Sequence, residues 1–376
     1  MTTKPTIHLA LVDDWELRGN GSGDVRELQF QPMRRLVSIY NRIGIRGSFN
    51  AEVMQQLTFR KHPQFNTLAD EWDQIVTETF RQGHDIQLHV HPQWHNAEYK
   101  DGEWNLSSDW SILNYPPEAA RRMLEDAKTY LEQLLTKVDP NYRCLSFRSG
   151  AWCIAPSPHM LQLLVELGIV FDMSIVAGVL YNTRNIKLDY TNCEEEFLPY
   201  YPVMTDARRV SNKVEPIICV PTNSFYASRR YVLLSHMQKV GGKFKQRVAS
   251  TASNRGNGGN TEVYGEWAEV SLMRRVYQKG VVPYIRGKHT ISDLAQLDYP
   301  LLKEMLDSIR KRARQSALTD VPIVLENHTK DLHNFAAIEQ FLEEAAGSSD
   351  VKFITLRELA MDLKQGKFKI KTRSKH

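Results

Sequence analysis

Hydrophobic positions along the chain follow two alternating patterns. Short, continuously apolar runs such as residues 7–12 are typical of strands that are covered on both faces. Longer segments with apolar residues three and four apart, such as 32–43, indicate amphipathic helices, and there Pro32 suits the first turn and Gly44 the end. The expected strands lie at 7–12, 45–50, 85–90, 144–148, 169–172, 217–220, 281–285 and 321–326, and the expected helices at 32–43, 68–80, 117–135, 158–167 and 299–315, before a final helix, strand and helix over 335–363. This alternation predicts an α/β fold with a parallel sheet, most economically closed into a barrel of seven or eight units.

Two segments interrupt this repeat. Residues 96–115 are polar and contain tryptophan, which predicts a long loop, and residues 182–266 include a Gly/Asn-rich piece at 254–260. The second segment has no acidic residue between Glu215 and Glu262 but several basic ones. These are Arg229, Arg230, Lys239, Lys243, Lys245, Arg247 and Arg255. They indicate either a solvated loop or a site for an anionic group such as a nucleotide or lipid phosphate.

Composition narrows the class of protein. The 376 residues are 42% hydrophobic and 24% charged, which excludes a disordered chain, and a net charge of +4 gives no reason to expect a nucleic-acid partner. No apolar run reaches the roughly 18 residues that span a bilayer, and residues 1–11 lack a secretory pattern. We therefore expect a cytoplasmic protein without a membrane span. Its four cysteines form no CxxC pair, so neither a zinc knuckle nor a redox motif is indicated.

Polar residues recur at the carboxyl ends of the predicted strands. These are Asp13 and Asp14 after the first strand, His89 and His91 at the third, Arg148 at the fourth, Asp172 at the fifth, and His328 after the strand at 321–326. In a barrel these strand ends converge on one face, where active sites are built. The sequence therefore predicts that these side chains share one site.

The first and third strand ends carry residue types that bind metal. Of two adjacent carboxylates, Asp13 and Asp14, one can ligate a metal while the other acts as a base, although a strand-ending turn or helix cap would use the same residues. His89 and His91 form a His-x-His pair, which on an extended backbone places both imidazoles on one side, within reach of one zinc or similar ion. One carboxylate with two or three nitrogen ligands leaves an open position, as a catalytic metal site requires.

The remaining strand ends suggest acid–base chemistry. Arg148 could hold the free aspartate ionised, or it could form a surface salt bridge. His328 could protonate a leaving group, and Asp172 could orient that histidine through its second ring nitrogen or else end the strand in a turn or helix cap.

Taken in order, these segments resemble the polysaccharide deacetylase family, the NodB-like carbohydrate esterases of family 4. The resemblance rests on residues 12–14, 83–89, 147–152, 171–174 and 325–328, which follow the family's order of motifs, and it is nearest to an intracellular branch linked with surface-polysaccharide biosynthesis. It implies a distorted (β/α) barrel of about seven units with loop insertions, and metal-dependent hydrolysis of an acyl amide on a sugar.

The resemblance also implies residue roles. Asp13 would be the base and Arg148 its partner, and Asp14 and His89 would bind a divalent metal, zinc first, with cobalt or nickel as alternatives. His328 would be the general acid, oriented by Asp172. The backbone N–H near Ala151 would bind the oxyanion, and Trp152 and Asn327 would contact substrate. Because the site residues run from Asp13 to His328, we expect residues 1–376 to form a single catalytic barrel with insertions at about 96–115 and 182–266 and a basic, frayed tail at 364–376.

The chain departs from the family pattern at the second metal histidine, which usually lies four residues after the first. That position is Gln93 here, so either His91 or His95 completes the site or the metal is held weakly. The expected substrate is an N-acylated, and first of all an N-acetylated, amino sugar, free or linked to a nucleotide or lipid. The sugar is favoured by tryptophans near the expected mouth: Trp15, Trp94, Trp104, Trp110 and Trp152. The alternatives are a non-sugar amide such as a cyclic ureide, and a catalytically silent sugar-binding relative; the oligomeric state is not predicted.

Overall fold

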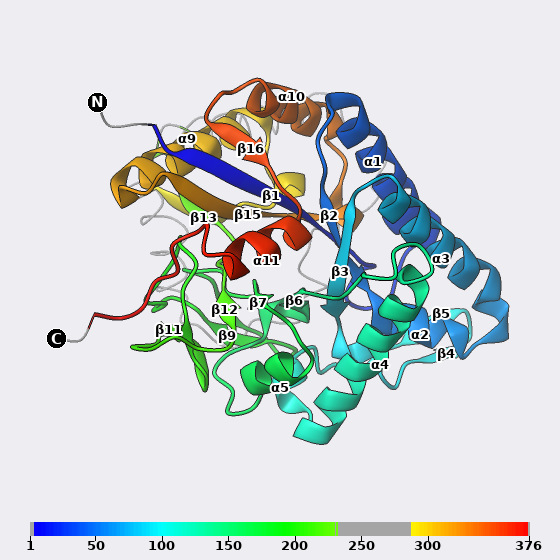
Figure 1. The fold of residues 1–376 in the computed structure, drawn as a ribbon. Helices are drawn as coiled ribbons and strands as arrows, with labels where there is room; N and C mark the ends of the chain where they lie inside the picture. Colours follow the sequence, from blue (N-terminus) through cyan, green and yellow to red (C-terminus); the bar gives the residue numbers. More distant parts are fainter. Residues whose placement is uncertain (1–3, 230, 232–286, 375–376) are drawn as a thin grey trace, which may run out of the picture.

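The computed structural model describes residues 4–229, 231 and 287–374. Within these residues the chain forms an eight-stranded sheet whose main path runs in the order β12, β7, β6, β3, β2, β1 and β15, with parallel pairing throughout (Figure 1). The strands are β1 (Thr6–Trp15), β2 (Ser48–Glu52), β3 (Asp85–Val90), β6 (Ser146–Ser149), β7 (Phe171–Asp172), β12 (Ile218–Cys219), β15 (Asp320–His328) and β16 (Val351–Phe353). Strand β16 pairs with residues 7–9 of β1, while β2 pairs with residues 12–15 of the same strand.

The sheet curves until its two ends meet. Just past β12, Thr222 forms a parallel bridge with Val324 of β15, and the Asn223 N–H donates to the Val324 carbonyl at 2.9 Å. These contacts join the last strand of the path to the first and close a distorted (β/α) barrel. The fold class expected from the sequence is confirmed, while the strand expected at 281–285 lies outside the described residues.

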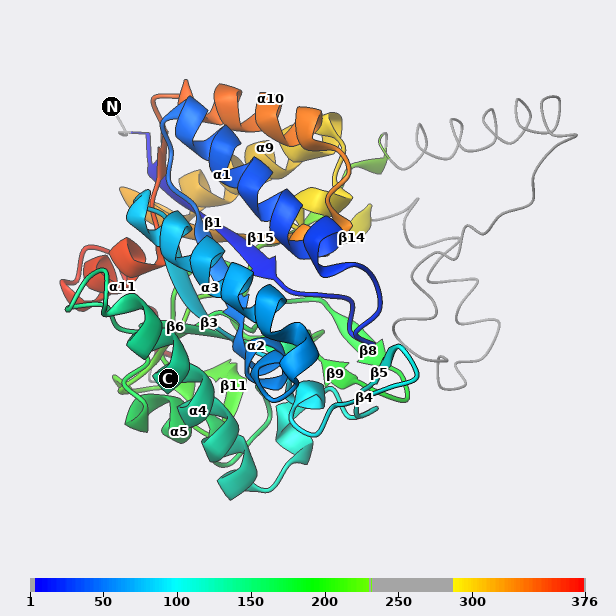
Figure 2. The same ribbon diagram turned by 90° about the vertical axis from the view of Figure 1, so that its right-hand side faces the viewer.

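Helices pack around the outside of the barrel, as Figure 2 shows for α1, α3 and α4. They are α1 (Gln31–Ile43), α2 (Val53–Arg60), α3 (Asn66–Arg81), α4 (Pro117–Leu135), α5 (Met160–Glu166), α9 (Tyr299–Ser316), α10 (Phe335–Ala346) and α11 (Leu356–Lys364). The sequence signals for α1 act as expected, because Pro32 lies in the first turn and Gly44 ends the helix in the left-handed region at φ 80°. Its buried stripe of Met33, Leu36 and Val37 packs against the sheet.

Strand β1 separates two hydrophobic cores. Leu9 and Leu11 belong to the large core between the sheet and the surrounding helices, whereas Ala10 and Val12 belong to a smaller cluster inside the barrel. Helix α11 adds Leu356 and other apolar side chains to this inner cluster and covers the end of the barrel where the strands begin (Figure 1). Because side chains alternate along a strand, consecutive residues at the carboxyl end of β1 point to opposite faces and have different surroundings.

The insertions contain more regular structure than expected. Residues 96–115 hold the hairpin of β4 (Glu98–Lys100) and β5 (Glu103–Asn105), and Trp104 in that hairpin stacks on Phe59 with ring centroids 5.7 Å apart. The prediction of a plain loop is therefore wrong there, because aromatic packing ties the segment to α2.

The second insertion is described only in part. Its described residues form β9 (Lys187–Asp189), β10 (Pro202–Val203), β11 (Asp206–Val210), β12 and β13 (Ser224–Ala227). Strand β9 pairs with β8 (Leu180–Asn182), and β13 pairs with β14 (Lys288–Ile291). The Gly/Asn-rich piece at 254–260, and the basic residues from Arg230 to Arg255, lie outside the described residues.

The basic C-terminal segment is attached to the second insertion. Lys371 forms a bridge with Tyr200, and the Arg373 N–H donates to the Ser211 carbonyl at 2.7 Å. The expectation of a frayed tail is therefore wrong as far as Arg373, because backbone hydrogen bonds hold it. In the part of the chain that the structure describes, no helix is both long and apolar enough to cross a membrane.

Candidate active site

The adjacent carboxylates of Asp13 and Asp14 face opposite sides of β1. Asp13 is fully buried on the outer face, where it accepts a hydrogen bond from the Tyr40 hydroxyl of α1 at 2.8 Å and another from the Asn327 amide. Burial raises the pKa of Asp13 to about 7, although both hydrogen bonds act against the rise. The predicted pairing of Asp13 with Arg148 is wrong, and Asn327, which was assigned to substrate, instead contacts Asp13.

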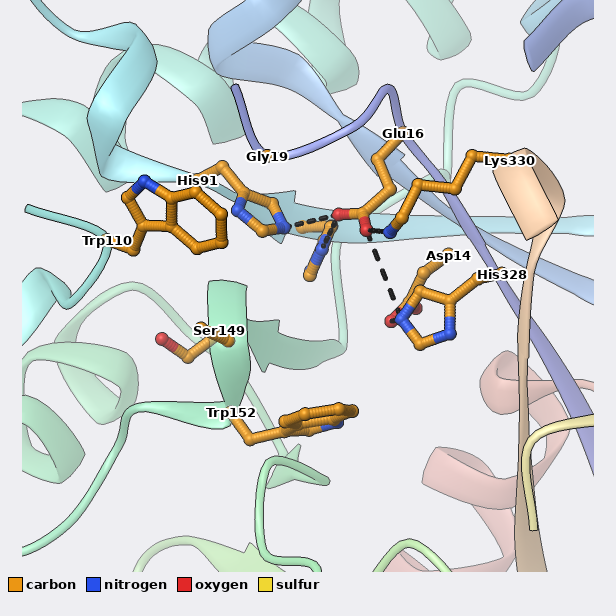
Figure 3. A pocket seen from close by; sticks show the side chains of 11 residues that line it. Asp14, Glu16, Gly19, His91, Trp110, Ser149, Trp152, His328 and Lys330 are labelled. Carbon is orange, nitrogen blue, oxygen red and sulfur yellow. Dashed lines mark hydrogen bonds and ion pairs between the residues drawn. The ribbon is translucent and has the colours of Figure 1, made fainter. Parts of the chain in front are cut away.

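The inward face of β1 opens onto a small cavity that is partly open to solvent (Figure 3). It lies at the carboxyl ends of β1, β3, β6 and β15, as expected for a barrel enzyme. The cavity is lined by Asp14, Glu16, Gly19, His89, His91, Trp110, Ser149, Ala151, Trp152, His328 and Lys330.

Three of these side chains form a group that could hold a metal ion: Glu16, His89 and His91. The Nε2 atom of His89 lies 3.0 Å from Oε2 of Glu16, and Nε2 of His91 contacts the same oxygen. Glu16 was missed from the sequence, although it lies two residues after Asp14 and therefore on the same side of the extended chain. Burial acts to raise the pKa of Glu16, but the neighbouring His91 and Lys330 hold it well below its usual range, so the carboxylate is charged.

Second contacts fix the orientation of both imidazoles. The Nδ1 atom of His89 lies 2.8 Å from the Arg148 carbonyl oxygen, which directs Nε2 toward Glu16. The Nδ1 atom of His91 lies 3.0 Å from the Gln93 amide nitrogen, and the Oε1 atom of that buried amide has no partner. Rotating the amide by 180° would let Oε1 accept a hydrogen bond from the Nδ1–H of His91 and leave Nε2 of His91 available to a metal. The rotation would break the long hydrogen bond, 3.4 Å, from the amide to the Gly19 carbonyl. Gln93 thus supports His91, and His95 does not line the cavity.

The donor set fits a divalent metal. Two imidazole nitrogens and one carboxylate oxygen are a set found in catalytic zinc sites, where a fourth position stays open. In this chain the donor atoms lie within 4.8 Å of one another, and the contact of His89 Nδ1 with a backbone carbonyl is typical of metal-binding histidines. The predicted ligand Asp14 belongs to a second group that could also hold a metal ion, together with Glu326 and His328.

Asp14 is held by a buried arginine. The Nη1 group of Arg148 donates to Oδ1 of Asp14 at 2.9 Å, and the Asn50 amide donates to the same oxygen at 2.8 Å. The other arm of Arg148 donates to Thr222 at 2.9 Å, so Arg148 is a buried partner and not a surface salt bridge. Burial acts to raise the pKa of Asp14, but Arg148, His89 and other neighbouring charges lower it below its usual value. Asp14 is therefore ionised at neutral pH.

His328 faces Asp14 across the cavity. Its Nε2 atom lies 3.9 Å from Asp14 and 3.7 Å from Glu326, and its Nδ1 atom lies 2.8 Å from Asp293. Burial and Lys330 act to lower the pKa of His328, but Asp293 and Glu326 outweigh them and raise it to about 10. The imidazole is therefore protonated at neutral pH and can donate a proton.

The sequence predicts that Asp172 orients His328. In the structure the orienting residue is Asp293. Among the described residues, Asp172 accepts hydrogen bonds from Ser174, at 2.6 Å from the hydroxyl and 3.1 Å from the backbone N–H. Asp293 reaches His328 because it forms a bridge with Glu326 beside β15. This contact joins distant parts of the chain and has no local sequence signal.

Ala151 and Trp152 form a rigid wall of the cavity. Both adopt the left-handed region, at φ 53° and 56°, a conformation that costs free energy and is concentrated at functional sites. The Trp152 indole donates to Glu326 at 2.8 Å, and its ring stacks on Tyr181 with centroids 5.9 Å apart and planes 7° apart. Trp110 lines the same cavity from the first insertion.

The other three tryptophans do not line this cavity. Trp15 and Trp94 are buried in the outer core, and Trp104 packs in the hairpin of the first insertion. The expectation that all five tryptophans lie at the mouth is therefore wrong, because three of them have apolar partners elsewhere.

Asp172 makes the stability of the protein depend on pH. Desolvation raises its pKa to about 7, so the folded protein holds this proton more tightly than the unfolded chain. The protonated Asp172 carboxyl therefore contributes fully to the free energy of unfolding below about pH 4. As the pH rises to about 7, this contribution is lost, by up to about 4 kcal/mol at about 1.4 kcal/mol per pKa unit. Urea unfolding of Asp172→Asn should therefore show a shallower loss of stability over that range. The exposed Asp70→Asn is the control, and an unchanged slope in the Asp172 variant would contradict the assignment.

Comparison with known proteins gives matches among solved structures only. No protein-family model and no curated protein matches the chain. It is similar to a structure named as a polysaccharide deacetylase from Mycobacterium smegmatis, at 14% identity and a TM-score of 0.49, covering 100% of this chain and 96% of the other. A probable polysaccharide deacetylase from Pseudomonas aeruginosa PAO1 has 14% identity and a TM-score of 0.47, with 96% and 91% covered. PuuE allantoinase has 12% identity and a TM-score of 0.47, with 95% and 90% covered.

Proposed function

We propose that the protein is a metal-dependent hydrolase that removes an N-acyl group, acetyl first, from an amino sugar or polysaccharide precursor. The observation that carries this proposal is the convergence of three groups on one cavity: the metal-ligand set around Glu16, the ionised Asp14 and the protonated His328. Each supplies a different requirement of amide hydrolysis. Zinc is the proposed metal, with cobalt and nickel as alternatives.

The proposed roles differ from those implied by the family resemblance. A divalent ion held by Glu16, His89 and His91 would act as a Lewis acid toward the acyl carbonyl. Asp14, kept ionised by Arg148, takes the proton of the attacking water. His328 then donates its proton to the departing nitrogen.

The cavity walls support a ring-shaped substrate. Trp152 cannot rotate freely, because its indole N–H, its ring face and its carbonyl oxygen are all engaged, the last by the Tyr190 hydroxyl at 2.6 Å. A fixed indole is a suitable surface for a sugar ring. Ala151 lines the same wall, and its backbone N–H is our proposed donor to the oxyanion.

The proposal is tested by measuring acyl release. The protein is stripped with a chelator, reloaded with zinc, cobalt or nickel, and incubated with N-acetylglucosamine in free, nucleotide-linked and oligomeric form, and with a cyclic ureide. The proposal is supported if the reloaded protein releases acetate from a sugar and the stripped protein does not. Hydrolysis of the ureide alone would change the substrate class, and a metal-loaded protein that hydrolyses neither would be a silent relative.

The contact between His328 and Asp293 predicts a change in the pH profile. Asp293→Asn removes a charge that raises the pKa of His328, so the basic limb of the kcat profile should move to lower pH. We also expect kcat to fall about tenfold or more, since the imidazole loses its orienting partner. Asp172→Asn is the matched control and should leave the basic limb in place. An unchanged limb in the Asp293 variant would remove His328 as the general acid.

A further inference from the structure

Lys330 brings a positive charge into the proposed metal site. It lies in the short helix η8 (Thr329–Asp331), directly after β15, and its ammonium forms an ion pair with Oε1 of Glu16. Both side chains are almost fully buried, at 9% and 5% exposure. Figure 3 shows Lys330 reaching Glu16 from the side opposite His91.

The two oxygens of Glu16 have different partners. Oε2 faces the Nε2 atoms of His89 and His91, while Oε1 contacts Lys330 and lies 4.0 Å from Nε2 of His328. A metal bound through Oε2 and the two imidazoles would share this carboxylate with the ammonium. Metal–ligand distances of about 2 Å place the two positive charges roughly 5 Å apart.

Charge decides how this sharing affects the metal. A buried carboxylate requires a compensating positive charge, and Lys330 provides one without any metal. Binding a divalent ion then brings two like charges together in a site that is mostly shielded from water, where their repulsion is stronger than at the surface. The same ammonium also draws electron density from Glu16, which makes it a weaker ligand.

We propose that Lys330 is a resident counter-ion that competes with the divalent metal for Glu16 and keeps the metal affinity below that of the same ligands without the lysine. This inference rests on the metal site of the proposed function. The metal-free protein therefore remains folded, and it binds the divalent metal only where the free metal concentration is high enough.

The experiment measures zinc affinity by competition with a chromophoric chelator. It compares the chelator-stripped wild-type protein with Lys330→Met, Lys330→Arg and Lys128→Met at one pH. We expect Lys330→Met to bind zinc at least about tenfold more tightly than wild type, and Lys330→Arg, which keeps the charge, to bind like wild type. Lys128 forms a partly exposed ion pair with Glu132 on α4, so its variant controls for loss of a lysine–glutamate pair elsewhere.

Thermal unfolding gives a second measurement. Without zinc, Lys330→Met should have a lower Tm than wild type, because Glu16 loses its counter-ion, and zinc should raise its Tm by more. If the methionine variant does not fold, Lys330→Gln replaces it, since its amide can still donate to Glu16. Equal or weaker zinc binding by the neutral variant would overturn the inference and leave the metal site intact. Absence of zinc binding in every variant would overturn the inference and the metal-dependent function together.

Discussion

Asp14→Asn is expected to lower kcat/KM by at least about 10²-fold, whereas Asp13→Asn should leave it within about threefold of wild type. The two residues are neighbours in the sequence, but Asp14 lines the cavity and is paired with Arg148, while Asp13 lies on the outer face of β1 against Tyr40. The measurement is acetate release by zinc-loaded protein, with zinc content determined for each variant.

Asp13→Asn should fold, which makes it a suitable matched control. The Oδ1 atom of Asn327 is buried and has no hydrogen-bond partner among the described residues, so rotation of that amide allows it to accept from a new asparagine at position 13. The neutral side chain also suits a position whose carboxyl is largely desolvated. If Asp13→Asn lost activity as Asp14→Asn does, the roles implied by the family resemblance, Asp13 as base and Asp14 as metal ligand, would hold and those proposed from the geometry would not.

Removing one imidazole from the ligand set should abolish metal loading. His89→Ala is expected to weaken zinc binding by at least about 100-fold and to reduce activity in proportion, because it leaves two protein ligands where a catalytic zinc site requires three. Zinc content after dialysis against buffer with trace zinc gives the first measurement, and activity at saturating zinc the second.

Histidines near the site provide the controls for this experiment. His91→Ala should behave like His89→Ala, since both Nε2 atoms face the same oxygen of Glu16. His95→Ala should keep its zinc, because His95 does not line the cavity. Loss of zinc from the His95 variant together with its retention in the His91 variant would contradict the proposed ligand set.

The sequence predicted the barrel and the position of the site but not the faces of β1. Residues 7–12 are apolar apart from His8, because one side of the strand packs against helices and the other fills the barrel. A continuous apolar run contains no alternation from which inward and outward positions could be read, and a shift of one residue exchanges them. The motif therefore placed Asp13 and Asp14 at the end of the strand but could not show that Asp14 and Glu16 are the pair that faces the cavity.

Local and distant contacts differed in how well they could be predicted. His89 and His91 are two residues apart on one strand end, so their proximity follows from the geometry of extended backbone. Asp293 reaches His328 only through the pairing of its segment with β15, and Gln93 supports His91 through a turn. No spacing rule connects such residues, and their roles depend on the folded structure.

The helix that covers the base of the barrel limits the route by which a substrate of the proposed hydrolase could reach the site. Since α11 fills the end where the strands begin, the described part of the chain offers no tunnel from one side of the barrel to the other. In the proposed reaction, substrate would enter and both products would leave through the same mouth beside Trp110 and Trp152. A long glycan could not thread through and be processed continuously. It would have to present one residue at a time from outside, which suits a chain end or a single activated sugar better than the middle of a polymer.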